Sequence, residues 1–415
     1  MFRSDYKIKI SLSSVQMFLL AIAPILHIYR FVSIVTWGEV VLCLAAVLSF
    51  AKGAHYVRKP NMLKTVFWII GYFAIPTLLG TLLWDGPLFD AFKEYLVFVI
   101  YYVIALILMQ RTELTAFISV YKKIALITAC LVIVQYVAHI ALGIYISGLI
   151  PNVTTYFGNS TNVYIGKATN RCAGFFTEPA MCARYMAVPF VLHIADLIKE
   201  NKKLIDFSTI ILTVALLFTL SGNAIAALVI GYGFYMLSNL KKRSIRSILR
   251  FIVLAVAFIV AVILLYRQPI FRRLFSRFEE ISGDSTFKSG YIRIVQGFVA
   301  YSHLPFPGPI LGIGFGNYKT IVDTYLWNIM VSATDLLPYW INGVQEYFIY
   351  GGIIGALLFG KLLLSCWRKG TQQQKLALTL FMAYLFIAGI AKTPLWIIFM
   401  VIIGSDALNQ TRKAE

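Results

Sequence analysis

Long apolar stretches, separated by short polar connections, dominate the pattern of hydrophobic and polar positions along the chain. Most hold about 18 to 22 residues, which is enough for an α-helix to cross roughly 30 Å of hydrocarbon. The pattern predicts about twelve membrane spans, at residues 12–29, 31–50, 65–83, 95–110, 124–146, 180–198, 204–220, 224–240, 249–266, 344–365, 376–391 and 393–407. The expected fold class is all-α: a polytopic transmembrane helix bundle in which residues 1–415 form a single integral membrane domain.

The charge of the connections predicts the orientation of this bundle. Lysine and arginine concentrate near residues 3–9, 52–64, 111–123, 199–203, 241–250, 368–375 and 412–413. All of these positions fall on one side of a twelve-span bundle. Because short cytoplasmic loops carry an excess of positive charge, both termini are expected in the cytoplasm.

Two long connections, residues 147–179 and 267–343, are expected as large external loops. They contain most of the glycine and proline punctuation, which suggests a site that faces outward. In the second loop, residues 270–281 (IFRRLFSRFEEI) place apolar side chains on one helical face and charged ones on the other. This pattern predicts an amphipathic helix in the external membrane interface. A helix that merely packs over the bundle is the alternative.

The composition agrees with a membrane protein, because 60% of residues are hydrophobic and only 13% are charged, against about a quarter in soluble domains. The net charge of +19 comes largely from loop residues that set topology, so no nucleic-acid partner is expected. The cysteines are scattered without a CxxC pair and predict neither a zinc site nor a disulfide framework. They are Cys43, Cys130, Cys172, Cys182 and Cys366. A bridge between Cys172 and Cys182 stays open, since both fall near one membrane face. No metal is expected.

The segment NRCAGFFTEPA, residues 170–180, places an arginine and a glutamate in front of a long apolar run. Guanidinium donates two parallel hydrogen bonds to phosphate, so Arg171 is a candidate ligand for a lipid-linked diphosphate. The alternative is an arginine that extends to lipid headgroups or pairs with Glu178. Pro179 suits a first helical turn, so the sixth span is expected to begin there. Glu178 is then a helix-start residue or a carboxylate that orients or deprotonates a sugar hydroxyl.

The second external loop offers further candidates. Arg293 is a second candidate phosphate clamp, and His303 is either a base or an ordinary loop histidine. The glycines of GIGFGNY are Gly312, Gly314 and Gly316. They permit either a nest of N–H groups that binds an anion or a close-packed re-entrant turn. Outside this loop, Glu39 lies within an apolar stretch, where a charge is costly and often functional, unless the residue lies at the outer end of a short helix.

Several segments together resemble the bacterial O-antigen polymerase family (Wzy type). RCAGFFTEPAMCARY is similar to an R-x-x-G-x-F-x-E-P segment that lies in an external loop before a transmembrane helix of that family. LFTLSGNAIAALV (217–229) resembles a helix-start motif with a serine and usually an arginine. GIGFGNY resembles a glycine-rich segment late in the second loop, and INGVQEYFIYGGIIG (341–355) one that ends in G-x-x-G.

The resemblance implies glycosyl transfer at the outer face of the bacterial cytoplasmic (inner) membrane. A growing glycan moves from undecaprenyl diphosphate to a new lipid-linked repeat unit, for lipopolysaccharide O-antigen, capsule or exopolysaccharide. The implied partners are undecaprenyl-diphosphate-linked oligosaccharide and the lipid bilayer, with a chain-length regulator and a flippase as further candidates. No nucleotide-sugar cofactor is needed, because the lipid already activates the donor. The catalytic residues would be Arg171, Glu178 and Arg293, and the substrate-binding residues would be Tyr291, His303, Gly312, Gly314, Gly316 and Asn317.

Two departures from the family pattern matter. The chain has Ser221-Gly222-Asn223 where related sequences often have Ser-Arg, so one expected cation is missing. Ile341 stands where the related O-antigen ligases carry a histidine, which favours a polymerase over a ligase and leaves the general base undetermined. A flippase or carrier is a different alternative; it would place its cations in a cavity within the spans. A structural or regulatory membrane protein is the last one.

Overall fold

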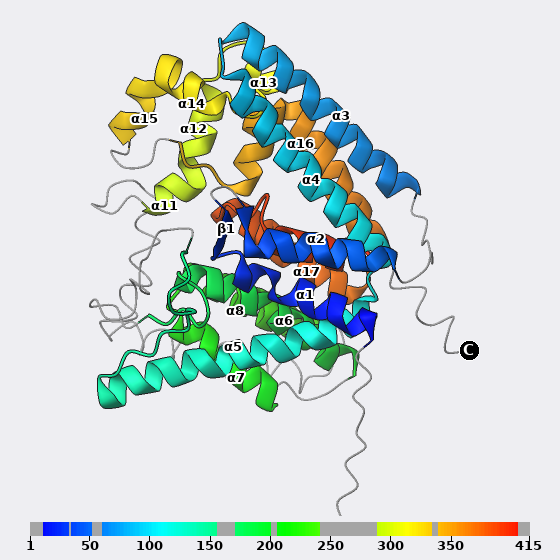
Figure 1. Cartoon of the computed structure of the whole chain (residues 1–415), viewed down its shortest axis with the longest axis vertical. Helices are drawn as coiled ribbons and strands as arrows, with labels where there is room; N and C mark the ends of the chain where they lie inside the picture. The colour runs from blue at the N-terminus through cyan, green and yellow to red at the C-terminus, as the bar shows by residue number, and fades with distance from the viewer. Residues whose placement is uncertain are drawn as a thin grey trace, which may run out of the picture.

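The computed structural model describes residues 11–32, 35–51, 60–155, 171–200, 206–240, 289–333 and 339–405, and helices dominate this part of the chain (Figure 1). The longer helices are α1 (Leu12–Leu26), α2 (Trp37–Phe50), α3 (Pro60–Leu83), α4 (Leu88–Arg111), α5 (Leu114–Leu142), α6 (Pro179–Lys199), α7 (Phe207–Phe218), α8 (Gly222–Leu240), α16 (Gly343–Lys369), α17 (Gln372–Ile387) and α18 (Pro394–Gly404). A small antiparallel hairpin pairs β1 (Arg30–Val32) with β2 (Val35–Thr36).

Short helical turns occupy the described part of the second predicted loop. They are α11 (Ser289–Tyr291), α12 (Gly297–Ser302), α13 (Gly308–Leu311), α14 (Tyr318–Ile321) and α15 (Trp327–Ala333), with π-helical turns η1 (Ile292–Gln296) and η2 (Val322–Leu326). Figure 1 shows α12 to α15 gathered at the upper left, beside the ends of α3 and α4. This part of the predicted loop is therefore a helical cap rather than an extended chain.

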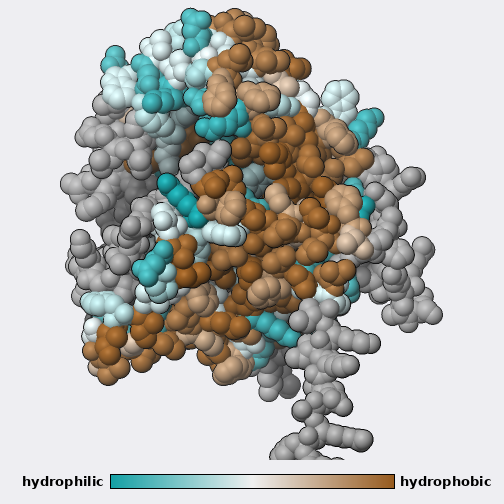
Figure 2. All heavy atoms as spheres, viewed as in Figure 1, coloured by the Kyte–Doolittle hydropathy of each residue, from teal (hydrophilic) through white to brown (hydrophobic). Residues whose placement is uncertain are grey.

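The helical membrane class is confirmed by five helices long and apolar enough to cross a membrane, namely α3, α4, α5, α6 and α16. Shorter apolar helices are α1, α2, α7, α8 and α18. Figure 2 shows hydrophobic residues covering much of one face, with hydrophilic residues gathered at its upper left. Twelve spans and their orientation stay predictions. The predicted span 249–266 and the amphipathic helix predicted at 270–281 lie outside the described residues.

The start of α2 differs from the prediction because a capping motif ends the preceding hairpin. The span was expected from residue 31, but the helix begins at Trp37. The Thr36 side chain accepts the Glu39 N–H (3.3 Å), and Glu39 Oε2 accepts the Thr36 N–H (2.7 Å). Such a reciprocal pair satisfies two backbone donors at a helix start. Glu39 therefore lies at a helix end, where the carboxylate also accepts a hydrogen bond from Tyr101 Oη (3.0 Å).

Two helices extend beyond their predicted spans because helix continues where the sequence stops being apolar. α4 was expected from residue 95 but starts at Leu88 and includes the polar Asp90 and Glu94. α5 was expected over 124–146; it starts at Leu114 and ends at Leu142, where Gly143 adopts φ +65. A left-handed glycine commonly ends a helix. Hydropathy thus located the apolar middle of these helices and missed their polar ends.

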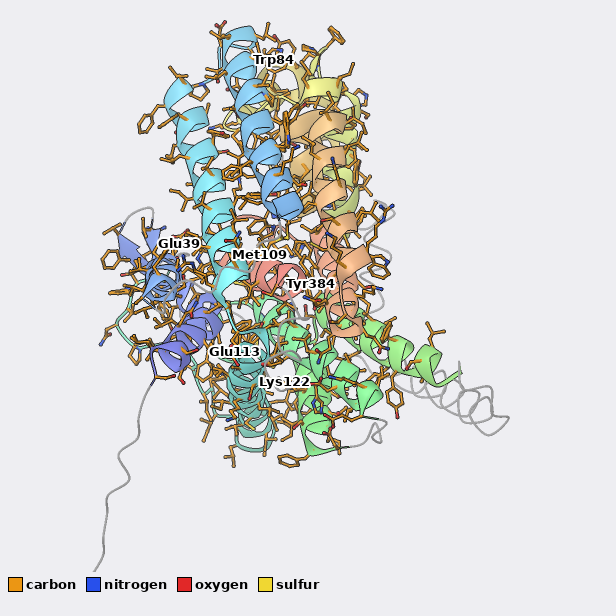
Figure 3. All side chains as sticks on the ribbon, turned by 90° about the vertical axis from the view of Figure 1, so that its right-hand side faces the viewer. Glu39, Trp84, Met109, Glu113, Lys122 and Tyr384 are labelled. Carbon is orange, nitrogen blue, oxygen red and sulfur yellow. The ribbon has the colours of Figure 1, made fainter. Side chains whose placement is uncertain are left out.

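The bundle contains two groups of helices with a layer between them. α3, α4 and α16 form the group at the upper right of Figure 1, and α5 to α8 form the lower group. α1, α2, α17 and α18 form a layer between these groups: α1 contacts α5, α2 and α18 contact α4, and α17 contacts both α16 and α6. Every residue of α18 is buried, as expected for a helix that is apolar all round. Figure 3 shows Tyr384 of α17 near the centre of the molecule, and its side chain is fully buried.

Successive helices alternate in direction, which brings together helix ends that carry lysine or arginine, such as Arg111, Lys199 and Lys369. The end of the bundle where α2, α4, α6, α16 and α18 finish is here named the basic end. There, Ser405 Oγ donates to the Met109 carbonyl (3.2 Å), and Gln374 Nε2 donates to the Ser405 carbonyl (2.7 Å). Lys122 of α5 and Asp196 of α6 form an ion pair at the same end. The opposite end, where α2, α4, α6, α8, α16 and α18 begin, is named the loop end.

Candidate functional site

The site is best described from the start of α6, where the sequence prediction is confirmed. The helix begins at Pro179, and Glu178 is its N-cap with extended backbone (φ −127, ψ 136). The Glu178 side chain makes no capping hydrogen bond. A helix N-terminus interacts favourably with a nearby carboxylate, and Glu178 places one there at the loop end of the bundle.

Arg184 lies between one and two turns into α6 and was not singled out in the sequence analysis. Its Nε donates to the Ala180 carbonyl (3.3 Å) within the helix. Glu178 and Arg293 both lie close enough for their charges to act on Arg184, as does the Tyr384 phenol. The signal that sequence analysis could have used is a cation in an apolar span, which is costly and usually functional.

Arg293 belongs to the helical cap and lies near Arg184. It lies in η1, and two side chains at the start of α16 fix the backbone of that turn. Asn342 Nδ2 donates to the Arg293 carbonyl (2.7 Å), and Gln345 Nε2 donates to the Ile294 carbonyl (3.0 Å). Glu178, Arg184 and Arg293 are together named the polar cluster. Arg293 is more than a hundred residues from Glu178 and Arg184 in the sequence, and helix packing brings it close to them.

Arg171 lies at the junction between α6, α7 and α8. Its Nε donates to the Thr219 carbonyl (3.3 Å) at the end of α7. α8 begins a few residues later, and Asn223 Nδ2 donates to the Ala180 carbonyl (3.3 Å) at the start of α6. The Asn223 carbonyl in turn accepts a hydrogen bond from Tyr384 Oη (2.9 Å). The structure therefore places Arg171 beside the elements that carry the polar cluster.

The glycines of the second loop match the close-packed turn rather than the anion nest. Gly312, Gly314 and Gly316 all have positive φ values (87, 71 and 75). Their N–H groups are used inside the protein: Gly314 N donates to the Tyr350 carbonyl (3.0 Å) and Gly316 N to Glu94 Oε2 (3.1 Å). Added Cβ atoms would come within 3.0 Å of the backbones of α16, α3 and α4. The nest interpretation is wrong, because these N–H groups are already bonded.

The other loop candidates have local roles. Asn317 is fully buried and its Nδ2 donates to the Ile313 carbonyl (2.8 Å), which holds the glycine turn closed. His303 is exposed, and its Nδ1 lies 2.9 Å from the Val299 carbonyl at the end of α12. This geometry fits the loop-histidine alternative. Tyr291 is partly buried and lies in α11, two residues before Arg293.

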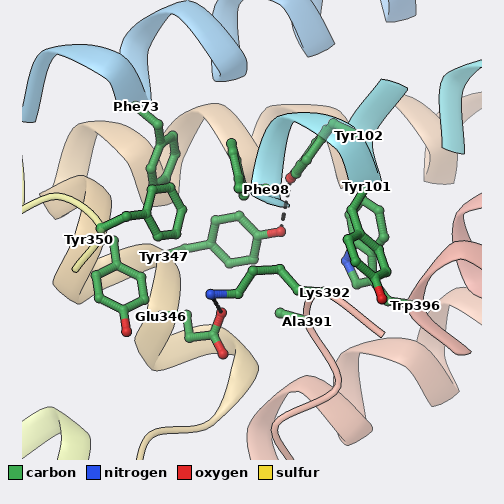
Figure 4. A pocket seen from close by; sticks show the side chains of 11 residues that line it. Phe73, Phe98, Tyr101, Tyr102, Glu346, Tyr347, Tyr350, Ala391, Lys392 and Trp396 are labelled. Carbon is green, nitrogen blue, oxygen red and sulfur yellow. Dashed lines mark hydrogen bonds and ion pairs between the residues drawn. The ribbon is translucent and has the colours of Figure 1, made fainter. Parts of the chain in front are cut away.

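A second charged pair at the loop end was also missed in the sequence analysis. Lys392, in the connection between α17 and α18, lies 3.8 Å from Glu346 on the first turn of α16. The pair lines a small pocket with aromatic walls (Figure 4). The Lys392 ammonium lies 5.1 Å from the Phe315 ring centre and 5.4 Å from that of Tyr350. Cation–π attraction adds to the ion pair in holding Lys392 there.

Within the described ranges, no group of three or more His, Cys, Asp and Glu side chains could hold a metal ion. Cys172 and Cys182 are both buried, and neither is bonded in a disulfide. Burial raises the pKa of Cys172 to about 12, which keeps this thiol protonated. The charged side chains described above at the loop end of the bundle are those of arginine, glutamate and lysine residues.

No family model matches the sequence, and no curated protein matches it either.

Proposed function

We propose that the protein is a membrane glycosyltransferase that polymerises a lipid-linked polysaccharide. A growing glycan would be transferred from undecaprenyl diphosphate to the non-reducing end of a new lipid-linked repeat unit at the outer face of the cytoplasmic membrane. The observation that carries this proposal is the gathering of Arg184 and Arg293 with Glu178, next to Arg171, at the loop end of the bundle.

The polar cluster brings two guanidinium groups, those of Arg184 and Arg293, to one place beside a single carboxylate. Guanidinium groups bind the oxygens of a diphosphate in a bidentate way, so this place suits the diphosphate of a lipid-linked donor. As the glycosidic bond to the lipid diphosphate breaks, negative charge grows on the leaving group. Cations fixed beforehand around it stabilise that charge without reorganising, which is usually a large contribution to catalysis.

Arg184 also bears on the departure from the family pattern. The chain has Gly222 and Asn223 at the start of α8, where the resemblance led us to expect an arginine. Asn223 contacts the first turn of α6, and Arg184 projects from the next turn of that helix. Arg184 thus supplies a cation at the same junction from the neighbouring helix. The cation at this junction of helices is therefore carried by α6 instead of α8.

The test is the surface-glycan profile of a strain that lacks the gene, complemented with wild type, Arg171→Ala or Arg368→Ala. Arg368 is an exposed arginine near the end of α16 at the basic end, so it is a matched control. We expect long chains to disappear in the deletion while single repeat units still reach the surface. Wild type and Arg368→Ala should restore them, and Arg171→Ala should not, at equal protein level.

Other outcomes point to the other functions. Accumulation of lipid-linked units on the cytoplasmic face would identify a flippase and overturn the proposal. Complete chains that remain on the lipid without reaching their final acceptor would identify a ligase. The buried Ile341 at the start of α16 offers no base at the position where related ligases have histidine, which is why the ligase is the weaker candidate.

A further inference from the structure

The reaction proposed above needs a base for the acceptor hydroxyl, and the sequence leaves that base undetermined. Glu178 is a poor choice in this structure. It lies at the N-terminus of α6, where a carboxylate interacts favourably with the helix dipole, and close to the cation of Arg184. It also lies among the cations that would hold the leaving group. The base is better placed outside the polar cluster.

Resting on the proposed function, we infer that Glu346 is the general base for the acceptor hydroxyl and that Lys392 is its positioning residue. Glu346 lies on the first turn of α16, four residues after Asn342, whose side chain fixes the turn that carries Arg293. The same helix start therefore holds both a leaving-group cation and the carboxylate. In a displacement with inversion, the base activates the attacking hydroxyl on the face of the sugar ring opposite the leaving group.

The surroundings of Glu346 suit a base. The side chains of Glu346 and Lys392 are 17% and 22% exposed, so the carboxylate is sheltered but reachable. The Lys392 ammonium lies 3.8 Å from the Glu346 carboxylate and fixes its orientation. Figure 4 shows the ammonium directed at the carboxylate from the aromatic side of the pocket. Glu94 of α4, the other carboxylate nearby, is committed to the N–H of Gly316 and holds the glycine turn.

The step balances without a cofactor. The acceptor hydroxyl gives its proton to the Glu346 carboxylate, and its oxygen forms the new bond to the anomeric carbon of the donor glycan. The bond between that carbon and the diphosphate oxygen breaks, and the lipid diphosphate leaves with the electron pair. The proton later passes from Glu346 to water. General-base catalysis of this kind contributes about 10²–10⁴-fold to the rate.

The experiment uses the full chain in proteoliposomes, with lipid-linked oligosaccharide extracted from the deletion strain as substrate. We expect Glu346→Gln to lower kcat about 100-fold or more with KM within about threefold of wild type, because the amide keeps the shape but cannot accept the proton. In Glu346→Ala, added formate should restore part of the rate, since a small carboxylate can occupy the space. Lys392→Met should lower kcat less. Glu113→Gln, an exposed glutamate at the start of α5, is the matched control.

The outcomes separate this inference from the proposed function. If wild type polymerises the extract and Glu346→Gln does so at a similar rate, the inference fails and the proposed function stands. If wild type makes no polymer, the proposed function fails first. Should Glu346→Gln not assemble, Glu346→Asp replaces it. Its carboxylate is about 1.5 Å shorter, so a large kcat loss at unchanged KM supports the base, and a wild-type kcat overturns it.

Discussion

The two ends of the bundle use charge in opposite ways. At the basic end, Lys122 of α5 forms an ion pair with Asp196 of α6, and Gln373 Nε2 of α17 donates to the same carboxylate. One carboxylate thus joins three helices. At the loop end, Arg184 lies near both the like charge of Arg293 and the opposite charge of Glu178. An ion pair between helices holds those helices together. Two guanidinium groups at one helix junction suit the binding of phosphate oxygens.

Removing Arg184 is the most direct test of the difference between the two ends of the bundle. We expect Arg184→Gln to reduce polymer formation about 100-fold, the usual loss when one preorganised donor is removed from a charged transition state. The melting temperature should stay equal or rise, because the variant removes the cost of burying a guanidinium, which is the largest influence on Arg184. Polymer is measured on the glycan profile and unfolding in detergent by intrinsic fluorescence.

Arg368→Gln at the basic end is the control for this prediction. It removes an exposed arginine and should leave both polymer and melting temperature unchanged. A melting temperature that falls by many degrees in Arg184→Gln, with polymer lost in proportion to folded protein, would show that Arg184 stabilises the helix packing. The contrast between the two ends would then disappear.

The glycine turn tests which part of the loop end is purely structural. Gly314→Ala adds a methyl group at φ +71, within 3.0 Å of the α3 backbone. We expect destabilisation of about 1–3 kcal/mol from overpacking, with more from the strained backbone. Gly71→Ala in the middle of α3 meets nothing within 4 Å and should stabilise by about 0.5–1 kcal/mol. Equal melting temperatures for the two variants would contradict the close-packed assignment.

Much of this architecture follows from local sequence, and the gaps have a physical cause. The Glu178–Pro179 pair marked the start of α6 because proline constrains the residue before it. Hydropathy found the apolar spans but not the polar start of α4, where Asp90 lies in the first turn. The partners of Arg184 could not be predicted, since they depend on how η1 packs against α16. The hydrogen bond from Asn342 to the Arg293 carbonyl is formed only in three dimensions.

The same reasoning explains why the sequence analysis chose the glycines as substrate-binding residues and did not single out Glu346 and Lys392. The glycines were predicted to bind substrate from a short motif, and the structure uses them for packing against three helices. Glu346 was not singled out within the quoted segment 341–355 and Lys392 belongs to no quoted motif, yet the two side chains lie 3.8 Å apart, one on α16 and one in the connection between α17 and α18. A motif reports local conformation reliably; a pair of side chains from distant segments requires the fold.

The basic end can be tested by removing one partner of its ion pair. Lys122 and Asp196 are 20% and 30% exposed, so solvent screens the pair only in part. We expect Lys122→Met to destabilise by about 1–2 kcal/mol, between the values for exposed and buried pairs. Polymer formed per folded molecule should not change. The double variant Lys122→Met/Asp196→Asn should lose less than the sum of the single variants; strict additivity would show that the pair does not fasten α5 to α6.

The smallest effect concerns Cys172, which lies next to Arg171 at the loop end. Burial raises the pKa of Cys172 to about 12, so at pH 8 only about one thiol in 10⁴ is the reactive thiolate. In a variant whose single cysteine is Cys172, maleimide labelling at pH 8 should be far slower than in one whose single cysteine is Ser302→Cys, an exposed position. The Cys172 rate should rise about tenfold per pH unit while the fold persists. Rapid labelling at pH 8 would mean that the Arg171 segment leaves its place against α7, and that the positive junction of the loop end is assembled only part of the time.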